Sequence, residues 1–379
     1  MMPVDEAELA GFITEAKGPL AVRGGNTRGV PVAGEVLSAA GLRGIELFEP
    51  GALTLVARAG TPVDEVEAVL AEQNQRLAFE PMDHRGLMGT QGSPTIGGVV
   101  AGNISGPRRV QVGAARDFLL GVRFVDGTGT VIRNGGRVMK NVTGYDLVKL
   151  MAGSWGTLGV LSEVALKVLP VAETQTTVIV HGLEAEAAVR AMSAALGSPF
   201  EVSGAAYDSD GSDGPVVMLR VEGFEGSVAY RAGQLGDLLG RFGEISLTGS
   251  PEQSADIWRS VRDVGAFHHR KGDVWKLSVK PSDAPGLAAQ LGAEALLFDW
   301  GGGLIWVLVP EGTDLRARAG QIDGHATLVR AGADTKARLG VFQPQPAPLE
   351  AISAGLRARF DPKGLLNTGL MQPATGVHV

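Results

Sequence analysis

Short glycine-rich segments carry the groups of this chain that are suited to binding a phosphorylated ligand. The first, RGGNTR at residues 23–28, follows a predicted strand and combines glycine amides with Asn, Thr and two Arg side chains. Backbone amides that converge without Cβ atoms, beside guanidinium groups, favour a bound anion such as a pyrophosphate. An ordinary glycine turn with solvated arginines has the same composition, so this loop by itself leaves both interpretations open.

A second series of glycines lies between Thr95 and Val168, where predicted strands end. Such turns also let backbone N–H groups approach a ligand closely. The chain holds 55 glycines in 379 residues, so glycine content is high everywhere and proves little. The stronger signal is the ordered succession of TIGGVVAGNISGPRR, VGAARDFLLG and GSWGTLGV.

Composition excludes several classes of protein. The net charge is −7 and no basic block stands out, which argues against nucleic acid as a partner. The absence of cysteine excludes disulfides, cysteine nucleophiles and an iron–sulfur cluster held by this chain's own thiolates. The N-terminus has no basic region followed by an apolar run, and no apolar run approaches the length of a membrane span. We therefore expect a cytoplasmic protein, with membrane contact at most peripheral and through partners.

The pattern of elements predicts an α+β fold in two domains. Residues 1–170 contain alternating strands, a hairpin about Asp126-Gly127 and short helices after Asp5 and Thr61, which we expect to cap them. Residues 171–335 combine strands with helices near 184–196, 226–241 and 252–264, which predicts an antiparallel sheet backed by helices. Residues 336–379 form a proline-rich linker, a last helix at 349–360 and a segment that returns to the first domain.

The ordered motifs resemble the FAD-linked oxidases that share the flavin domain of p-cresol methylhydroxylase and vanillyl-alcohol oxidase. RGGNTR, TIGGVVAGNISGPRR, VGAARDFLLG, GSWGTLGV and DPKGLLN carry this resemblance over residues 20–170 and 355–370. GPRR, VMKNVTGYDLVKLMAGSWG, KPSDAP, DWGGGL and GHAT are similar to the smaller FAD-binding subunit of the bacterial three-subunit glycolate oxidase. These segments extend the likeness into the second domain. The resemblance implies that this domain is a cap that contacts the substrate or the partner subunits.

The resemblance implies which residues bind FAD. The first loop is expected to hold the pyrophosphate, residues 81 and 82 to approach the flavin, the glycine-rich centre to contact phosphate and ribityl, residues 156–160 to meet adenine and ribose, and Asn367 to reach the isoalloxazine ring. The expected residues are Arg23, Gly24, Gly25, Asn26, Thr27, Arg28, Pro81, Met82, Thr95, Ile96, Gly97, Gly98, Asn103, Ser105, Gly106, Gly113, Arg116, Asp117, Gly156, Thr157, Gly159, Val160 and Asn367.

Departures from the family pattern refine the expectation. The first loop has Asn-Thr-Arg where covalent relatives carry a flavin-linking histidine, so we expect non-covalent FAD. Asn367 is followed by Thr where proline is common. Larger relatives that oxidise 2-hydroxy acids carry a histidine cluster that binds a metal, whereas this chain has only His268-His269 and His325 in the second domain outside His181. We therefore predict no metal site.

Oxidation of a small hydroxy acid needs a cation for its carboxylate and a base for its hydroxyl. Our catalytic candidates are His325, Lys276 and Arg262, and Arg108 and Arg109 are further candidates for the cation. Each also has an ordinary structural interpretation: a surface or phosphate-side arginine, a solvated lysine, a histidine that caps a turn. His84 follows a strand and has the chemistry of a base, but a lone loop histidine is usually solvated.

Three functional hypotheses follow. The chain is a flavin-dependent subunit that oxidises a 2-hydroxy acid, with glycolate as the expected substrate, or it is an electron-relay and assembly subunit, or it is a standalone flavin oxidase of another substrate. The resemblance implies a complex with a larger FAD-linked subunit and an iron–sulfur subunit. The lack of cysteine fits that arrangement, because electrons then leave through metal centres on another chain.

Overall fold

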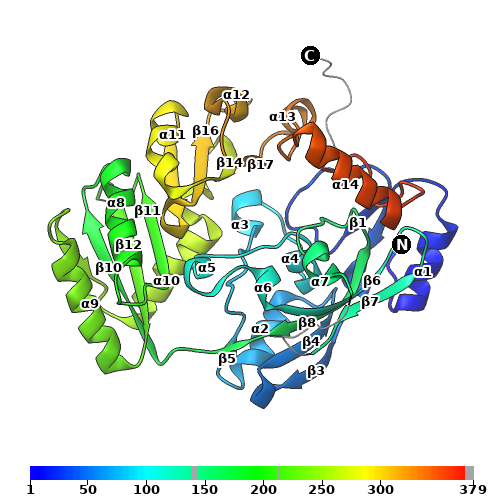
Figure 1. Ribbon diagram of the computed structural model, residues 1–379, viewed down its shortest axis with the longest axis horizontal. Helices are drawn as coiled ribbons and strands as arrows, with labels where there is room; N and C mark the ends of the chain where they lie inside the picture. Colours follow the sequence, from blue (N-terminus) through cyan, green and yellow to red (C-terminus); the bar gives the residue numbers. More distant parts are fainter. Residues whose placement is uncertain (138–143, 212, 372–379) are drawn as a thin grey trace.

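The computed structural model describes residues 1–137, 144–211 and 213–371, and Figure 1 shows two units side by side. The first unit contains a five-stranded sheet, in the order β3-β4-β8-β6-β7, whose paired strands are antiparallel. Its strands are β3 (Ile45–Glu49), β4 (Thr54–Arg58), β8 (Val160–Lys167), β6 (Leu119–Val125) and β7 (Val131–Gly135). Six of the eight residues of β8 are buried, because helices cover one side of the sheet and the N-terminal segment covers the other.

The N-terminal part of the first unit contains seven α-helices among its described residues. They are α1 (Glu6–Glu15), α2 (Val63–Ala71), α3 (Arg85–Met88), α4 (Ile96–Ala101), α5 (Arg109–Val112), α6 (Ala115–Phe118) and α7 (Leu147–Met151). Of these, α1, α4, α6 and α7 pack against the five-stranded sheet. Asp5 caps α1 by accepting from the amide of Glu8, as predicted. The predicted cap at Thr61 is wrong: α2 begins at Val63, and the Thr61 hydroxyl donates to the carbonyl of Arg58 instead.

The C-terminal segment returns to the start of the chain. Strand β1 (Leu20–Arg23) pairs in parallel with β2 (Glu35–Ser38), and on its other side Leu20 donates to the carbonyl of Leu365 at 2.7 Å. The amide of Asn367 donates to the carbonyl of Leu20 at 3.0 Å. Helix α14 (Ala347–Phe360) precedes this return and lies near β1 in Figure 1.

The second unit is built on an eight-stranded antiparallel sheet in the order β13-β10-β12-β11-β15-β16-β14-β17. The strands are β10 (Thr174–His181), β11 (Gly204–Asp208), β12 (Val216–Gly223), β13 (Ile245–Leu247), β14 (Asp273–Ser278), β15 (Ala295–Asp299), β16 (Leu304–Val309) and β17 (His325–Arg330). The helices are α8 (Ala185–Leu196), α9 (Glu225–Leu239), α10 (Pro251–Asp263), α11 (Ala284–Gln290), α12 (Leu315–Ala319) and α13 (Ala333–Leu339). A small pair, β5 (Gln75–Arg76) with β9 (Leu169–Pro170), lies in the first unit. The predicted helix-backed antiparallel sheet is confirmed.

The two faces of the second sheet have different partners. Along β16, Leu304, Trp306 and Leu308 join the core that includes the first sheet, whereas Ile305, Val307 and Val309 join the core under α8, α9 and α11. Side chains of a strand alternate between the two faces, so one apolar strand can serve both cores. The second sheet is therefore also a wall of the first unit.

A buried ion cluster joins the two units. Arg108 of the first unit contacts Glu222 at 2.6 Å and Glu80 at 2.8 Å. Arg220 of the second unit, 1% exposed, contacts Glu80 at 2.9 Å. Each carboxylate thus bridges arginines from both units, which fixes how the units meet.

Candidate functional site

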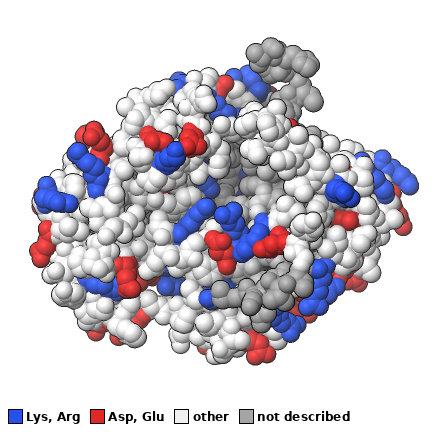
Figure 2. Space-filling view, in the orientation of Figure 1, with Lys and Arg blue, Asp and Glu red and all other residues white. Residues whose placement is uncertain are grey.

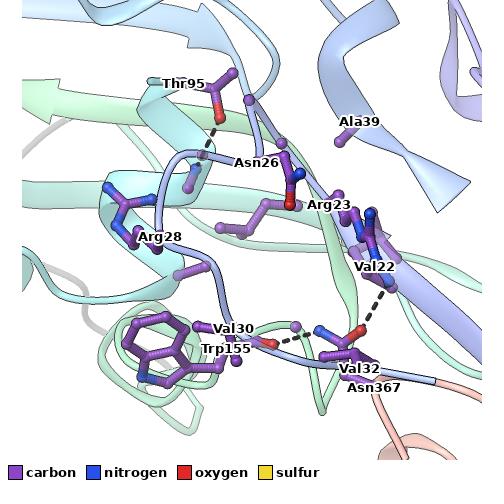
Figure 3. A pocket seen from close by; sticks show the side chains of 18 of the residues that line it. Val22, Arg23, Asn26, Arg28, Val30, Val32, Ala39, Thr95, Trp155 and Asn367 are labelled. Atoms are coloured by element: carbon purple, nitrogen blue, oxygen red, sulfur yellow. Dashed lines mark hydrogen bonds between the residues drawn. The ribbon is translucent and has the colours of Figure 1, made fainter. Parts of the chain in front are cut away.

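A cavity lies in the first unit, where β1 ends and the glycine loops converge (Figure 3). Its walls combine apolar side chains with exposed backbone. The lining residues are Val22, Arg23, Gly24, Gly25, Asn26, Thr27, Arg28, Gly29, Val30, Val32, Ala39, Ala59, Thr95, Gly97, Gly98, Ala101, Trp155, Gly156, Gly159, Val160, Leu161, Asn367 and Leu370. Apolar walls with a few convergent polar groups are typical of a small-molecule site.

Close contacts of the backbone explain the glycines of the first loop. A Cβ atom on Gly25 would lie 1.6 Å from the carbonyl oxygen of Ser93, and one on Gly24 would lie 2.3 Å from Thr95 Oγ1. The loop 23–28 is therefore pressed against the segment before α4. Thr95 caps α4 by accepting from the amide of Gly98 at 3.2 Å, which holds the two glycine segments in one wall.

Arg28 provides buried cationic donors in this wall. Nε and Nη2 of its guanidinium are buried, and neither binds a hydrogen-bond partner within the described part of the chain. Burial lowers the pKa of Arg28 to about 10, and Asp83 partly offsets that effect. The group stays charged at neutral pH, and buried donors without partners cost free energy. An anion bound in the cavity would satisfy them.

Asn367 closes the cavity from the C-terminal segment. Its Oδ1 accepts from the amide of Val22 at 2.7 Å, and its Nδ2 donates to the carbonyl of Trp155 at 2.7 Å (Figure 3). One side chain thereby connects β1, the GSWG turn and the end of the chain. Asn tolerates the positive φ of 45° that this position requires.

A second, larger cavity continues from the first and lies between the two units. Arg28, Val30 and Trp155 line both cavities. The walls come from α5, the turn after β15, strands β14 and β17, and the segment 341–346. Figure 2 shows Lys and Arg side chains gathered around the hollow between the units.

Two cations in this second cavity lie against tryptophan rings. The Arg109 guanidinium carbon is 4.3 Å from the centre of the Trp300 ring. Lys276 Nζ is 5.5 Å from the Trp300 ring and 5.6 Å from the Trp306 ring. Burial, followed by the charge of Arg109, lowers the pKa of Lys276 to about 8. The low pKa means that the empty site disfavours a second positive charge beside Arg109. A bound anion would raise the pKa of Lys276 and keep it charged.

Trp300 is held in place by the first unit and by the end of β15. Its Nε1 donates to the carbonyl of Gly106 at 3.0 Å, and its amide donates to Asp299 Oδ1 at 2.7 Å. Burial raises the pKa of Asp299 to about 7. The cation site thus depends on a contact between the units.

Two histidines line the second cavity. His84 is 7% exposed and precedes α3, and its Nδ1 lies 3.2 Å from the carbonyl oxygen of Met82. His325 is exposed and begins β17 at the cavity wall. Partial desolvation of its ring at the cavity wall lowers the pKa of His325, and the charges of Lys276 and Arg109 add to the shift. The expectation that His84 is a solvated loop residue is wrong, because the side chain is buried. The contact between the two units buries it, and sequence spacing does not reveal that contact.

The structure brings most of the predicted cofactor residues together. All six residues of the first loop, with Thr95, Gly97, Gly98, Gly156, Gly159, Val160 and Asn367, line the first cavity. Asn103 and Arg116 line the second cavity. Pro81, Met82, Ile96, Ser105, Gly106, Gly113, Asp117 and Thr157 line neither. Ile96 and Met82 point into the core, Ser105 accepts from the amide of Ala115, and Asp117 from the amide of Ala114.

The catalytic candidates separate in the same way. Lys276 and His325 share the second cavity with Arg109. Arg262 lies outside both cavities, and its guanidinium binds Asp263 at 2.8 and 2.7 Å. Arg262 lies at the end of α10 and is paired with its neighbour rather than facing a cavity, so the structure gives no support to its selection as a catalytic residue. Arg108 belongs to the buried ion cluster. Residues 138–143, from the VMKNVTGYD motif, lie outside the described residues.

Comparisons with known proteins identify the family. A profile described as "FAD binding domain" matches residues 1–135. Glycolate oxidase subunit GlcE of Escherichia coli (strain K12) is 36% identical over 360 residues, which are 94% of this chain and 93% of that protein. The chain belongs to the GlcE family. The resemblance found in the motifs is thereby confirmed.

Two further comparisons match part of the chain or its fold. Glycolate oxidase subunit GlcD of Bacillus subtilis (strain 168) is 39% identical over 99 residues, 26% of this chain and 21% of that protein. A solved alkyldihydroxyacetonephosphate synthase has the same fold, with a TM-score of 0.70 at 16% identity over 97% of this chain and 76% of the other. That likeness confirms the predicted type of flavin fold.

FAD is the cofactor of this GlcE-family chain, and the residues present fit it. The first cavity offers backbone from glycine loops, and Arg28 supplies buried donors for an anionic pyrophosphate. The connected second cavity leaves room beside it for a substrate. No helix among the described residues is long and apolar enough to cross a membrane.

Proposed function

We propose that this chain is the FAD-containing subunit of a glycolate oxidase complex and that it oxidises a small 2-hydroxy acid in the second cavity. The observation that carries the proposal is the pair of cations, Arg109 and Lys276, packed against tryptophan rings in a cavity that joins the FAD site. A small carboxylate is the ligand that matches two adjacent cations. Similarity to GlcE, a glycolate oxidase subunit, supports glycolate as that carboxylate.

The chain's own residues would do three things in the reaction. Arg109 and Lys276 would bind the carboxylate and fix the orientation of the hydroxyl-bearing carbon. Trp300 and Trp306 would hold the two cations and exclude water from one side of the site. A base in the same cavity would take the hydroxyl proton. Bound FAD supplies the two-electron oxidation itself.

We further propose that FAD is held without a covalent bond. The first cavity's lining contains no histidine, tyrosine or cysteine, among the residues that the structure describes. Purified chain should absorb as an oxidised flavin, and acid precipitation should release the flavin into the supernatant. Flavin that stays with the precipitated chain would show that the attachment is covalent, and a folded chain that takes up no FAD would contradict the cofactor site.

Partners follow from what the chain lacks. It has no cysteine for an iron–sulfur cluster, so electrons from FAD need an acceptor outside this chain. We propose a complex with a larger FAD-linked subunit and an iron–sulfur subunit, which the similarity to GlcE and GlcD supports. Co-expression with those two subunits should give an assembly that oxidises glycolate with an artificial acceptor, and omission of this chain should abolish that turnover.

The test of the proposed activity uses the purified FAD-loaded full chain under anaerobic conditions. Glycolate should bleach the visible flavin absorption, whereas acetate, which has the carboxylate but no hydroxyl, should only perturb it. If glycolate fails to reduce the flavin of this chain, both in the isolated chain and in the assembled complex, the proposed activity is contradicted. Such a result would favour the relay or assembly role.

A further inference from the structure

His84 occupies a position in the second cavity that the cofactor site does not explain. It lies at the end of the segment 81–84, immediately before α3, and is buried although it belongs to a loop. The same cavity is lined by Arg109, Lys276 and Trp300. A histidine thus shares a cavity with the two cations proposed to bind a carboxylate.

Its hydrogen bond determines which ring nitrogen carries the proton. Nδ1 lies 3.2 Å from the carbonyl oxygen of Met82, and a carbonyl can only accept, so Nδ1 is the donor. In the neutral ring Nε2 then has a free lone pair. Nε2 has no hydrogen-bond partner among the described residues, and it is the ring atom left to bind a ligand in the cavity.

The surrounding charges keep the ring neutral. Burial, then Arg28 of the first loop and Lys276 of β14, lower the pKa of His84 well below its usual value of 6.5. The Met82 carbonyl and the neighbouring Asp83 act in the opposite direction with smaller effect. Asp83 is itself committed to Arg85, at 2.7 Å. The histidine therefore presents an unprotonated Nε2 near neutral pH.

We propose that His84 is the base of the 2-hydroxy acid site, with Nε2 accepting the hydroxyl proton of a substrate held by Arg109 and Lys276. This inference rests on the proposed function. The O–H bond breaks, its proton moves to Nε2, and its electron pair forms the second bond of the product carbonyl. The carbon-bound hydrogen leaves with its electron pair to FAD, the oxidant, and the product is a 2-oxo acid.

His325, the histidine predicted from the sequence, is the less suitable base. It is exposed where β17 begins, and its ring has no hydrogen bond among the residues that the structure describes. Without a partner on one nitrogen, neither its tautomer nor its orientation is fixed. A base that is already held in one tautomer and orientation does not have to be ordered before it reacts.

The decisive variant is His84→Asn, whose side-chain amide can still donate to the Met82 carbonyl but has no basic nitrogen. Anaerobic reduction of the flavin by glycolate should slow by roughly 10²–10⁴-fold, the usual contribution of a general base. The decline in rate at acid pH, which His84 causes when it is protonated, should disappear. FAD content and the Kd of oxalate should stay within about twofold of the wild type, because the Arg109 and Lys276 contacts remain.

Two further variants serve as comparisons. His181 lies on β10 and its Nε2 is 2.7 Å from Ser246 Oγ, away from both cavities, so His181→Asn should behave as the wild type. If His325→Asn rather than His84→Asn removes the acid limb, His84 is not the base. Loss of FAD in His84→Asn would make His84 a cofactor residue and would also overturn the proposal.

A measurement that does not depend on turnover keeps the proposal testable. In the full chain labelled with ¹⁵N-histidine, the signals missing from His84→Asn should report a neutral ring protonated at Nδ1 at pH 7. An imidazolium or an Nε2–H tautomer would overturn the assignment. If glycolate fails to reduce the wild-type flavin, the proposed function itself fails and this role with it. A normal rate in His84→Asn would overturn the role alone.

Discussion

At the residue scale, the chemistry of the second cavity rests on side chains whose charge is set by their surroundings. Lys276 has a pKa of about 8, so it is close to losing its proton under mildly alkaline conditions. A neighbouring arginine and two tryptophan rings surround it. Binding of a carboxylate should therefore depend on pH in a way that one substitution can isolate.

We predict that the Kd of oxalate for the FAD-loaded chain rises as the pH increases through about 8, because Lys276 loses its charge. Far enough above that pKa, each pH unit should weaken binding by up to about tenfold. In Lys276→Arg the cation stays charged and this pH dependence should vanish. Lys276→Met should raise the Kd by roughly 10–100-fold at pH 7, the value of a charge-assisted hydrogen bond. A Kd that is independent of pH in the wild type would contradict the carboxylate site.

Gly98 and Gly106 were both expected to let the backbone approach FAD, but the structure separates their roles. Gly98 lines the first cavity, and its Cβ would lie 2.9 Å from Arg28 Nη1. Gly106 lines neither cavity, and its Cβ would lie 2.3 Å from the carbonyl oxygen of Glu80. The first glycine leaves space at the ligand cavity, whereas the second is required by the packing of the protein itself.

We therefore predict that Gly98→Val lowers FAD content while the FAD-free chain keeps its melting temperature. Gly106→Ala should instead destabilise the chain by about 1–3 kcal/mol, the usual cost of overpacking. Flavin absorbance per chain and thermal unfolding of the FAD-free proteins would measure both effects. Full FAD occupancy in Gly98→Val would show that Gly98 only forms a turn.

At the element scale, the C-terminal segment completes the cofactor domain. It adds to β1 through Leu365 and Asn367, although more than 300 residues separate the partners. Asn367 then connects β1 to the turn at Trp155, and all three line or border the first cavity. The cavity therefore forms only when both ends of the first unit have assembled.

We predict that Asn367→Ala lowers the free energy of unfolding of the FAD-free chain by roughly 3–4 kcal/mol and weakens FAD binding. Two hydrogen bonds contribute about 1 kcal/mol each, and the positive φ adds about 1–2 kcal/mol for an Ala residue. Asn367→Gly is the matched control, because glycine relieves the backbone cost but not the lost hydrogen bonds. Denaturant unfolding and FAD titration measure the two effects. If both variants have wild-type stability and FAD affinity, Asn367 does not contribute to the FAD site.

At the scale of the whole molecule, the second cavity exists because the two units meet in one arrangement. The ion cluster of Glu80, Arg108, Arg220 and Glu222 is buried at that junction. Burial alone would raise the pKa of Glu222, but Arg220 and Arg108 hold it well below 4.5. Burial also acts to raise the pKa of Glu80, but the same two arginines lower it below its ordinary value.

The sign of these shifts predicts an acid-sensitive junction. A carboxylate whose folded pKa is lowered stabilises the fold above its unfolded pKa, and that contribution is lost as the pH falls toward the folded value. We expect unfolding at acid pH to begin below about pH 4.5, the ordinary pKa of these groups. Glu222→Gln should cost about 3–5 kcal/mol at pH 7, as when one partner of a buried pair is removed. Glu186→Gln, on an exposed pair, is the control; equal effects of both on denaturant unfolding would contradict the role of the cluster.

The sequence by itself determined the family, the type of cofactor and most of the first cavity. This was possible because the first-loop, TIGG and GSWG residues are contiguous runs, and the close backbone contacts that they form require glycine. Their order along the chain carries the signal. The helices and the antiparallel second sheet also followed from local periodicity.

Only the tertiary structure decided which charged residues belong to the second cavity. Lys276, Arg109 and His84 come from separate segments of both units, and their neighbours are distant in the sequence. Arg262 and Arg108 looked equivalent to Arg109 in the sequence, but acidic residues at the junction neutralise them. His84 looked like a surface residue until the contact between the units buried it. Burial and charge pairing depend on contacts across the fold, and residue spacing does not specify them.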